Sequence, residues 1–368
     1  MHKSVTQSAF IQAKNKLNEK AFPDFLRKLN AKFPLRKTTY GLHVFAIDGS
    51  DLNVPADKKD CSTLIPYNSK KGGYHQIHLN ALFDLLENRF TDAVIQPRKQ
   101  MREVDAACSM VDACDTPGKC LFLFDRGYES LNLMAHVCER SSFFLIRAKD
   151  VYSQVSPFRL LKLPDHEEFD FPVRFVCTRN LKLKNEDPVL YKCFQKKQRF
   201  DYIPPDDKTG TYELCFRLVK LTLDNGTTEY LITNLPKKKF PPRDLKKLYN
   251  LRWGVEVAFL HTKYNACLNY FHSINREFIA QEIFAKLIFH NFVSLIVSCT
   301  EVPASDTKYL YKIAFADAAY KCRCFLLRLK AFEDISTLLL QNLSPIRPGR
   351  SFDRNIQSQR LRPLQHRS

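Results

Sequence analysis

The chain has 368 residues, of which 45% are hydrophobic and 26% are charged. This composition excludes collagen-like and mostly disordered proteins, and the length allows about two or three structural units. The 57 Lys and Arg residues exceed the 39 Asp and Glu residues, which gives a formal net charge of +18. A positive charge this large favours a polyanionic partner, either nucleic acid or an anionic membrane surface.

The cysteines and the most apolar segment narrow these alternatives. The 12 cysteines include no Cys-x-x-Cys pair, and no signal-peptide apolar run follows residues 1–4, which predicts reduced thiols in a cytoplasmic protein. Segment 278–299 is apolar but carries a polar residue at every fourth position, namely Glu282, Lys286, His290, Ser294 and Ser298. This stripe predicts an amphipathic helix rather than a membrane span, so nucleic acid becomes the expected partner.

The N-terminal part of the chain predicts alternating strands and helices. Residues 1–40 form a helical segment interrupted by Pro23 and Pro34. An apolar run at 42–47 predicts a buried strand that ends in a turn at Asp48. Strands at 76–83 and 90–95 continue it as an antiparallel meander. A helix at 103–114, a strand at 121–124 ending in Asp125, a helix at 129–140 and a strand at 143–147 complete a first core section, 41–150.

The rest of the chain predicts an insertion and a return to the core. Short β-type runs at 151–240 predict a β-rich insertion, with a hairpin where Asn225 and Gly226 separate the runs 213–223 and 228–233. From residue 243 the chain is predicted to be helical almost to residue 343. This part comprises a second core section at 241–300 and a C-terminal helical region at 301–344, followed by a basic tail at 345–368. The predicted class is α/β, a mixed sheet with flanking helices.

Two aspartates stand out by their position. Asp48 and Asp125 each follow an apolar strand and precede a turn that contains glycine. Strand ends hold side chains at the rim of a sheet, where a ligand can reach them. Either residue alone is more simply explained as an aspartate that caps a turn or a helix, which is common.

A third candidate element is a helix near residue 256. Tyr249, Arg252, Glu256 and Lys263 fall within a stripe about 60° wide if they share one helix. A carboxylate flanked by cations and a phenol suits a metal ion beside a phosphate. The alternative is a solvated helix face with an ordinary Arg252–Glu256 pair.

The three acidic residues together indicate a more specific arrangement. A carboxylate on the first strand, one after the fourth strand and one on a later helix is how a ribonuclease H-like fold assembles a two-metal site. Two divalent ions about 4 Å apart can activate an attacking oxygen and stabilise the leaving oxygen. Oxygen ligands favour Mg²⁺ or Mn²⁺ and leave room for a substrate phosphate.

The sequence resembles the DDE transposases of bacterial insertion sequences, from the family-four branch marked by the signature Tyr-x2-Arg-x3-Glu-x6-Lys. Here the signature is Tyr249, Arg252, Glu256 and Lys263 with every spacing intact. The other family blocks match 46–50, Ala-Ile-Asp-Gly-Ser, and 124–128, Phe-Asp-Arg-Gly-Tyr. The similarity covers roughly residues 5–300.

The resemblance implies roles for these residues. Asp48, Asp125 and Glu256 would bind two Mg²⁺ or Mn²⁺ ions and form the catalytic triad. Arg252 and Lys263 would contact phosphates at the element end, and Tyr249 would orient that end. Three further lysines that precede the signature helix are expected to contact DNA beside the site: Lys237, Lys238 and Lys239. Trp253 is expected to pack in the core.

The function implied is cut-and-paste DNA transposition. The enzyme would act as an endonuclease on terminal inverted repeats and transfer the freed 3′ end to target DNA. It would form a homodimer in the synaptic complex and would be located in the bacterial cytoplasm, associated with the nucleoid. Two alternatives remain open. Only 47 residues precede Asp48, which is consistent with a shortened or domesticated copy that binds DNA without completing transposition. A ribonuclease H-fold nuclease without strand transfer would share the triad.

Overall fold

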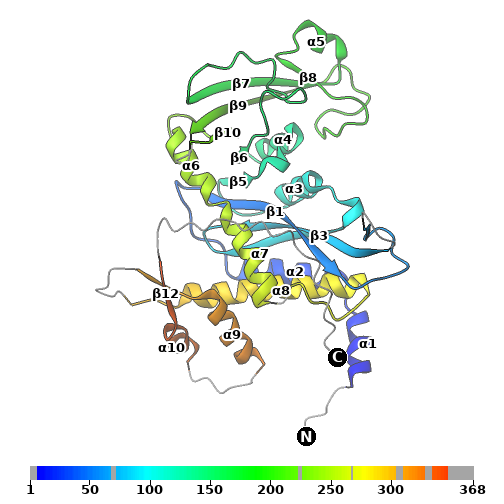
Figure 1. The fold of residues 1–368 in the computed structure, drawn as a ribbon, viewed down its shortest axis with the longest axis vertical. Coiled ribbons are helices and arrows are strands. Elements are labelled where there is room, and N and C mark those ends of the chain that lie inside the picture. The colour runs from blue at the N-terminus through cyan, green and yellow to red at the C-terminus, as the bar shows by residue number, and fades with distance from the viewer. Residues whose placement is uncertain are drawn as a thin grey trace.

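The computed structural model describes residues 6–67, 72–222, 226–266, 268–303, 310–327 and 334–346. Its centre is a ten-stranded mixed sheet in the order β2-β3-β1-β5-β6-β10-β9-β7-β8, with β4 also paired to β3. Helices lie along this sheet (Figure 1). The predicted class is confirmed, because this is a mixed α/β architecture with flanking helices, consistent with a ribonuclease H-like fold.

The first part of the sheet is the predicted antiparallel meander. Its strands are β1 (His43–Val54), β2 (Leu64–Pro66), β3 (Gly73–Asp84) and β4 (Arg89–Pro97), and β3 pairs antiparallel with the other three. The alternation predicted for β3 is confirmed, since Ile77, Leu79, Ala81 and Phe83 all belong to one hydrophobic cluster. The short strand β2 was not predicted.

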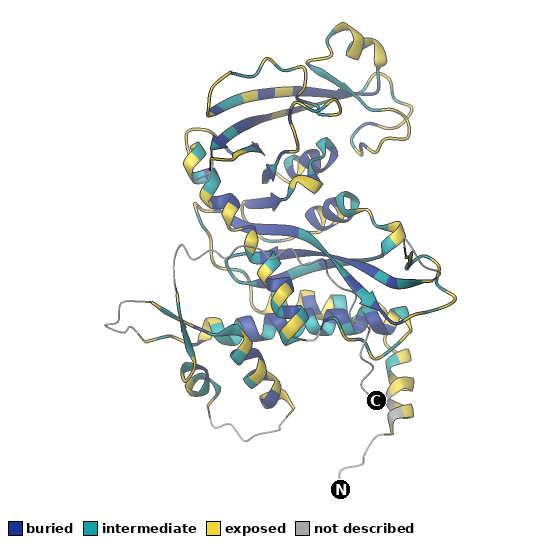
Figure 2. Ribbon diagram, in the orientation of Figure 1, coloured by how far each residue is buried: buried dark blue, intermediate teal, exposed yellow. Residues whose placement is uncertain are grey.

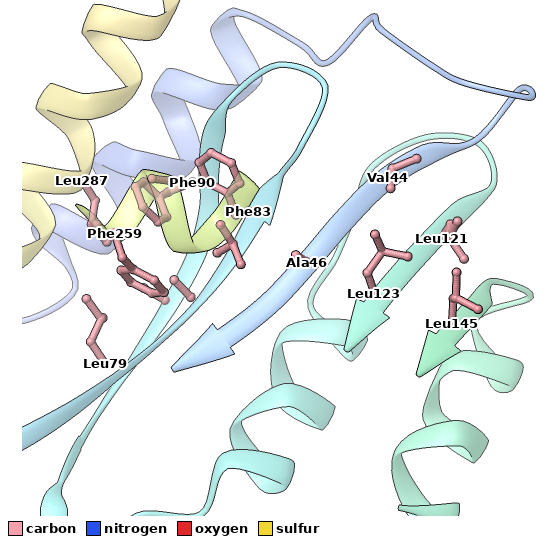
Figure 3. Packing of buried hydrophobic residues seen from close by; sticks show 14 of the residues in the cluster. Val44, Ala46, Leu79, Phe83, Phe90, Leu121, Leu123, Leu145, Phe259 and Leu287 are labelled. Carbon is pink, nitrogen blue, oxygen red and sulfur yellow. The ribbon is translucent and has the colours of Figure 1, made fainter. Parts of the chain in front are cut away.

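The next two strands run parallel to β1 and separate two hydrophobic layers. They are β5 (Cys120–Phe124) and β6 (Phe143–Arg147). Side chains on one face, such as Phe45 and Phe122, pack against α3 (Glu103–Asp112) and α4 (Leu131–Glu139). Side chains on the other face, such as Ala46 and Leu123, join a cluster with Phe259 and other residues of α2 (Ala21–Lys32), α6 (Pro242–Asn250), α7 (Trp253–Asn265) and α8 (Arg276–Cys299) (Figure 3). The central strands are therefore buried on both faces (Figure 2).

The inserted strands prolong the central sheet. They are β7 (Phe169–Thr178), β8 (Tyr191–Cys193), β9 (Thr211–Thr222) and β10 (Thr228–Thr233), with the short helix α5 (Leu181–Glu186) between β7 and β8. β10 pairs antiparallel with β6, which makes the sheet continuous. The predicted hairpin is present, because β9 and β10 pair antiparallel with Thr222 opposite Thr228. Asn225 of its turn lies outside the described residues.

The remaining elements are mostly helical, with one correction. They are α1 (Gln7–Asn15), α2 (Ala21–Lys32), α6 (Pro242–Asn250), α7 (Trp253–Asn265), α8 (Arg276–Cys299), α9 (Phe315–Leu326) and α10 (Ile335–Leu340), with 3-10 turns at Arg98–Gln100 and Arg126–Tyr128. The C-terminal region is not all helical, because β11 (Tyr311–Ile313) and β12 (Leu343–Pro345) pair antiparallel. This pairing joins segments about thirty residues apart, which local periodicity does not reveal. The tail beyond residue 346 lies outside the described residues.

The long helix α8 packs in the core, and its predicted polar stripe is only partly correct. Within the described residues it is the one helix long and apolar enough to cross a membrane. His290 and Ser294 of the stripe are buried. The Ser294 hydroxyl donates to the backbone oxygen of Asn88, and the side-chain oxygen of neighbouring Asn291 accepts from the backbone N–H of Phe90. These side chains face inward because the turn between β3 and β4 needs hydrogen-bond partners.

Candidate active site

Asp48 lies inside strand β1, not at its end. β1 continues to Val54 because β3 pairs with it throughout, with Asp48 opposite Ala81. The parallel pairing with β5 stops earlier, at Ala46 and Leu123. Asp48 therefore lies where β1 has lost its neighbour on one side, which leaves its side chain accessible although the strand does not end there.

Asp125 lies at the equivalent position of the neighbouring strand. It directly follows β5, which ends at Phe124. Because Ala46 is paired with Leu123, Asp48 and Asp125 are each two residues further along adjacent parallel strands. Side chains alternate between the faces of a sheet, so both aspartates lie on the face that carries Ala46 and Leu123. This is also the face against which α6 and α7 pack.

The signature residues lie on two helices rather than one. Tyr249 belongs to the last turn of α6, Arg252 precedes α7, and Glu256 and Lys263 lie on α7. The two helices are linked by a tight turn. The N–H of Arg252 donates to the carbonyl of Tyr249 at 3.0 Å, and the N–H of Val255 donates to the carbonyl of Arg252 at 3.2 Å. These bonds span three residues rather than four, so α6 leads directly into α7 (Figure 1).

Gly254 allows α7 to begin close to the sheet. A Cβ atom at this position would lie 2.8 Å from the Leu85 side chain. The absence of a side chain therefore brings the first turn of α7, and with it Glu256, next to the end of β3.

Arg252 occupies the centre of the site. Its side chain is buried, with an exposed fraction of 5%. One terminal nitrogen donates to Oε1 of Glu256 at 2.8 Å, and the other lies 3.9 Å from Oδ2 of Asp48. Since both nitrogens belong to one guanidinium, Asp48 and Glu256 are held on either side of a single cation. The guanidinium also lies over the rings of Tyr249 and Trp253.

Trp253 does not pack in the core as predicted. Its side chain is exposed to 45% and its ring centre lies 5.1 Å from the guanidinium carbon of Arg252. Trp253 begins α7 on the outward side of the tight turn. The aromatic ring therefore covers Arg252 from the solvent side.

The electrostatics of the aspartates reflect burial and crowding. Burial raises the pKa of Asp48 to about 6, although the Gly49 N–H and the Arg252 charge act in the opposite direction. The negative charges of Glu256 and Asp125 raise this pKa further. The Tyr249 hydroxyl donates to Oδ1 of Asp125 at 3.4 Å, and burial raises the pKa of Tyr249, so it remains a neutral donor.

Lys263 lies further along the same helix and contacts β1. Its ammonium donates to the backbone oxygen of Asp51 at 3.5 Å. Burial lowers the pKa of Lys263, while the charges of Asp51 and Asp48 partly oppose that effect. Lys263 thus adds a second cation on the same side of the site as Asp48.

The three lysines at 237–239 do not border the aspartates as expected. They are exposed and follow β10, which runs antiparallel to β6 and so ends where the parallel strands begin. The ammonium of Lys239 donates to the backbone oxygen of Tyr40, just before β1, and Lys237 lies 3.7 Å from Asp170. The aspartates lie at the other end of the parallel strands, where the β1–β5 pairing stops. Helix α6 connects the lysines to the turn at Arg252 beside the aspartates.

The residues suit a divalent metal in chemistry but are not yet arranged around one. Three carboxylates provide the oxygen ligands that Mg²⁺ and Mn²⁺ prefer. Among the described residues, no three His, Cys, Asp or Glu side chains are grouped so that they could hold a metal ion together. The guanidinium of Arg252 instead contacts Glu256 and lies near Asp48. A metal bound by Asp48 and Glu256 together would take the place of this guanidinium.

Sequence reasoning missed the residues beneath the site. His78 of β3 lies 2.6 Å from Asp51 and 3.0 Å from Glu103, on the face opposite Asp48. The Tyr128 hydroxyl is buried, has no hydrogen-bond partner in the described part of the chain, and is influenced by the charges of Asp48 and Glu103. The sequence signal for His78 was the alternation of β3, which places it opposite the apolar positions. Tyr128 is the last residue of the 124–128 block, but no role was predicted for it.

The continuous mixed sheet with flanking helices, and the acidic residues that follow the β1–β5 parallel pairing, make this an α/β protein consistent with a ribonuclease H-like fold. Within this class, residues 39–292 match the family model described as "Transposase DDE domain". This match spans more than half of the chain, so the chain belongs to the transposase DDE domain family. No curated protein matches the sequence.

One solved structure is also similar. It is a cryo-EM structure of a piggyBac transposase synaptic complex with hairpin DNA, with 13% sequence identity and a TM-score of 0.41. The match covers 84% of this chain and 59% of that chain. A likeness at this level carries no conclusion about substrate or mechanism.

Proposed function

We propose that this chain is a metal-dependent DNA transposase that cleaves the ends of a mobile element and joins them to target DNA. The observation that carries the proposal is a transposase DDE domain in which Arg252 pairs with Glu256 and lies near Asp48, while Tyr249 donates to Asp125. Carboxylates from β1, from the residue after β5 and from α7 would supply acidic ligands, and the buried Arg252 and the half-buried Lys263 would supply partners for phosphate.

The proposed roles follow from the contacts of each residue. Asp48, Asp125 and Glu256 would hold two Mg²⁺ or Mn²⁺ ions, which supply an activated water and stabilise the leaving oxygen. Arg252 would exchange Glu256 for a DNA phosphate, because a planar guanidinium binds either anion in the same way. Lys263 would bind a phosphate near Asp51, and the Tyr249 hydroxyl would hold Asp125 in place.

The proposed partners are the terminal inverted repeats and target DNA, bound by a homodimer. The exposed lysines 237–239 are proposed to bind the DNA backbone away from the cleavage position, since they lie at the opposite end of the central strands from the aspartates. A second candidate function is DNA binding without transposition. The Arg252–Glu256 pair favours it, because that pair keeps the carboxylates apart.

The decisive experiment uses duplexes that cover the DNA flanking the gene, with Mg²⁺. One substrate is intact and a second carries a preformed 3′-hydroxyl at the element end. Strand transfer supports the transposase, hydrolysis alone indicates a nuclease, and binding without reaction indicates the second candidate. Asp48→Asn and Asp125→Asn should abolish the reaction, whereas Asp92→Asn on β4 is the matched control and should retain it.

A further inference from the structure

Strand β1 needs additional support at Asp48. Up to Ala46 it is paired on both sides, with β3 and β5, but from Asp48 onward only β3 remains as a neighbour. A strand paired on one side is more easily displaced than one paired on both. A metal ligand must nevertheless be held within about 0.5 Å of its productive position. Residues that contact β1 beyond Ala46 could therefore hold Asp48 in position.

His78 provides a contact at this point from the opposite face of the sheet. It lies on β3 directly opposite Asp51 of β1. Its Nδ1 lies 2.6 Å from Oδ1 of Asp51, and its Nε2 lies 3.0 Å from Oε1 of Glu103 in the first turn of α3. The side chain is only 5% exposed. His78 therefore connects β3, β1 and α3 through one buried ring.

The ring is pressed against the residue that follows Asp48. A Cβ atom on Gly49 would lie 2.3 Å from Nε2 of His78 and 3.0 Å from Oε1 of Glu103, so only glycine fits there. The N–H of Gly49 in turn donates to Oδ1 of Asp48 at 2.9 Å. Gly49 thus contacts both residues: its α-carbon lies against the ring of His78, and its N–H donates to the carboxylate of Asp48.

The pKa of His78 favours a positively charged ring between Asp51 and Glu103 at neutral pH. Burial alone would lower the pKa of His78, but the contacts with Asp51 and Glu103 raise it to about 9. Arg98 adds a second cation beside Asp51, with Nε at 3.1 Å from the carboxylate. The imidazolium is thus hydrogen-bonded to Asp51 of β1 and forms an ion pair with Glu103 of α3.

We infer that His78 is a positioning residue for Asp48. By bridging Asp51 to Glu103 across Gly49, the ring fixes the backbone of β1 where pairing with β5 has ended, and the Gly49 N–H then orients the carboxylate. This inference rests on the proposed function, because it assumes that Asp48 binds metal. Residues that orient metal ligands from outside typically contribute about 10–100-fold to metal affinity.

The first test compares His78→Ala with His75→Ala in the full chain. His75 is a matched control, because it is also a buried histidine of β3 but contacts Thr63 near the far end of β1. Amide hydrogen exchange by mass spectrometry should become faster at residues 47–51 in His78→Ala and not in His75→Ala. Mn²⁺ binding, measured with the metal alone by titration calorimetry, should weaken about 10–100-fold only in His78→Ala.

The outcomes separate this inference from the proposed function. Unchanged exchange at residues 47–51 in His78→Ala overturns the inference, and so does faster exchange with unchanged Mn²⁺ affinity. If the unaltered chain binds no Mn²⁺ at all, with or without duplex DNA, the proposed function fails. In that case faster exchange limited to His78→Ala still supports the fixing of β1.

A double-mutant cycle gives an independent test. Gly49→Ala should displace the ring of His78 and produce the same faster exchange and the same loss of Mn²⁺ affinity. In a His78→Ala background the added methyl group has room, so Gly49→Ala should have little further effect. Additive effects of the two substitutions would mean that ring and glycine act separately, which contradicts the inference.

Discussion

Replacing Asp48 with asparagine should stabilise the protein in the absence of metal. Burial raises the pKa of this carboxyl from 3.8 to about 6, and only 23% of the side chain is exposed. At neutral pH the folded protein therefore holds an ionised group that would be more favourable in the unfolded chain. A pKa difference of this size corresponds to about 3 kcal/mol of lost stability.

The sign of the effect follows from where the proton is bound. Below pH 3.8 Asp48 is protonated in both states and costs nothing. Between pH 3.8 and about 6 the unfolded chain loses its proton first, so stability falls as pH rises, and above about pH 6 the full cost is present. The asparagine variant has no such cost, but its amide accepts a weaker hydrogen bond from Gly49, a loss of about 1 kcal/mol. The net gain for Asp48→Asn at pH 7.5 is about 2 kcal/mol.

The measurement is the free energy of unfolding by denaturant, with a chelator present, from pH 4 to pH 8. The difference between Asp48→Asn and the unaltered chain should grow up to about pH 6 and then remain constant. Asp84, whose pKa burial raises to about 7, titrates in both proteins and cancels in the difference. Mg²⁺ should then stabilise the unaltered chain and not the variant. A variant that is less stable at pH 7.5, or a difference independent of pH, would identify Asp48 as a structural residue.

Three further predictions concern the cations. Arg252→Ala and Lys263→Ala should each weaken duplex DNA binding and lower the slope of log affinity against log salt by about one, because each removes a phosphate contact. Lys263→Arg should retain more affinity for DNA than Lys263→Ala, because it keeps the positive charge. Lys239→Ala should lower the same slope without changing single-turnover cleavage, since this side chain lies far from the aspartates. Duplex DNA should tighten Mn²⁺ binding to the unaltered chain but not to Arg252→Ala, because a phosphate that binds Arg252 frees Glu256.

Each of these predictions has a clear contrary result. Unchanged salt slopes in both Arg252→Ala and Lys263→Ala would mean that the α7 residues form an ordinary salt-bridged surface. Slower cleavage in Lys239→Ala at saturating DNA would place the lysines close to the reaction. Equal Mn²⁺ affinity with and without duplex DNA would show that Arg252 does not compete with the metal.

The sequence predicted the strands of the core because their signals are local. Apolar runs and alternation located β3, β5 and β6 to within a few residues, and for β1 they located the start but not the end. The position of Asp48 within β1 could not be read in this way. Asp-Gly is a common turn signal, yet the chain continues as a strand because β3 pairs with it as far as Val54. Such pairing between distant segments overrides the local preference.

The signature shows the same limit on the helical side. Its spacing predicted that Arg252 and Glu256 share a face, and the 2.8 Å contact between them agrees. The spacing does not reveal that the hydrogen-bond pattern tightens at Arg252 and separates α6 from α7. It also gave no indication of His78, because this residue reaches the site only through the pairing of β3 with β1.

The position of Arg252 explains how acidic ligands can remain together before a metal binds. Burial raises the pKa of Asp48, and repulsion from the nearby carboxylates of Glu256 and Asp125 raises it further. The guanidinium lowers this cost by lying between Asp48 and Glu256, but it cannot take the place of a metal in catalysis. The same cation and a metal cannot both occupy the space beside Glu256. If a DNA phosphate binds Arg252 as proposed, it frees Glu256, and substrate binding and metal binding should then favour each other.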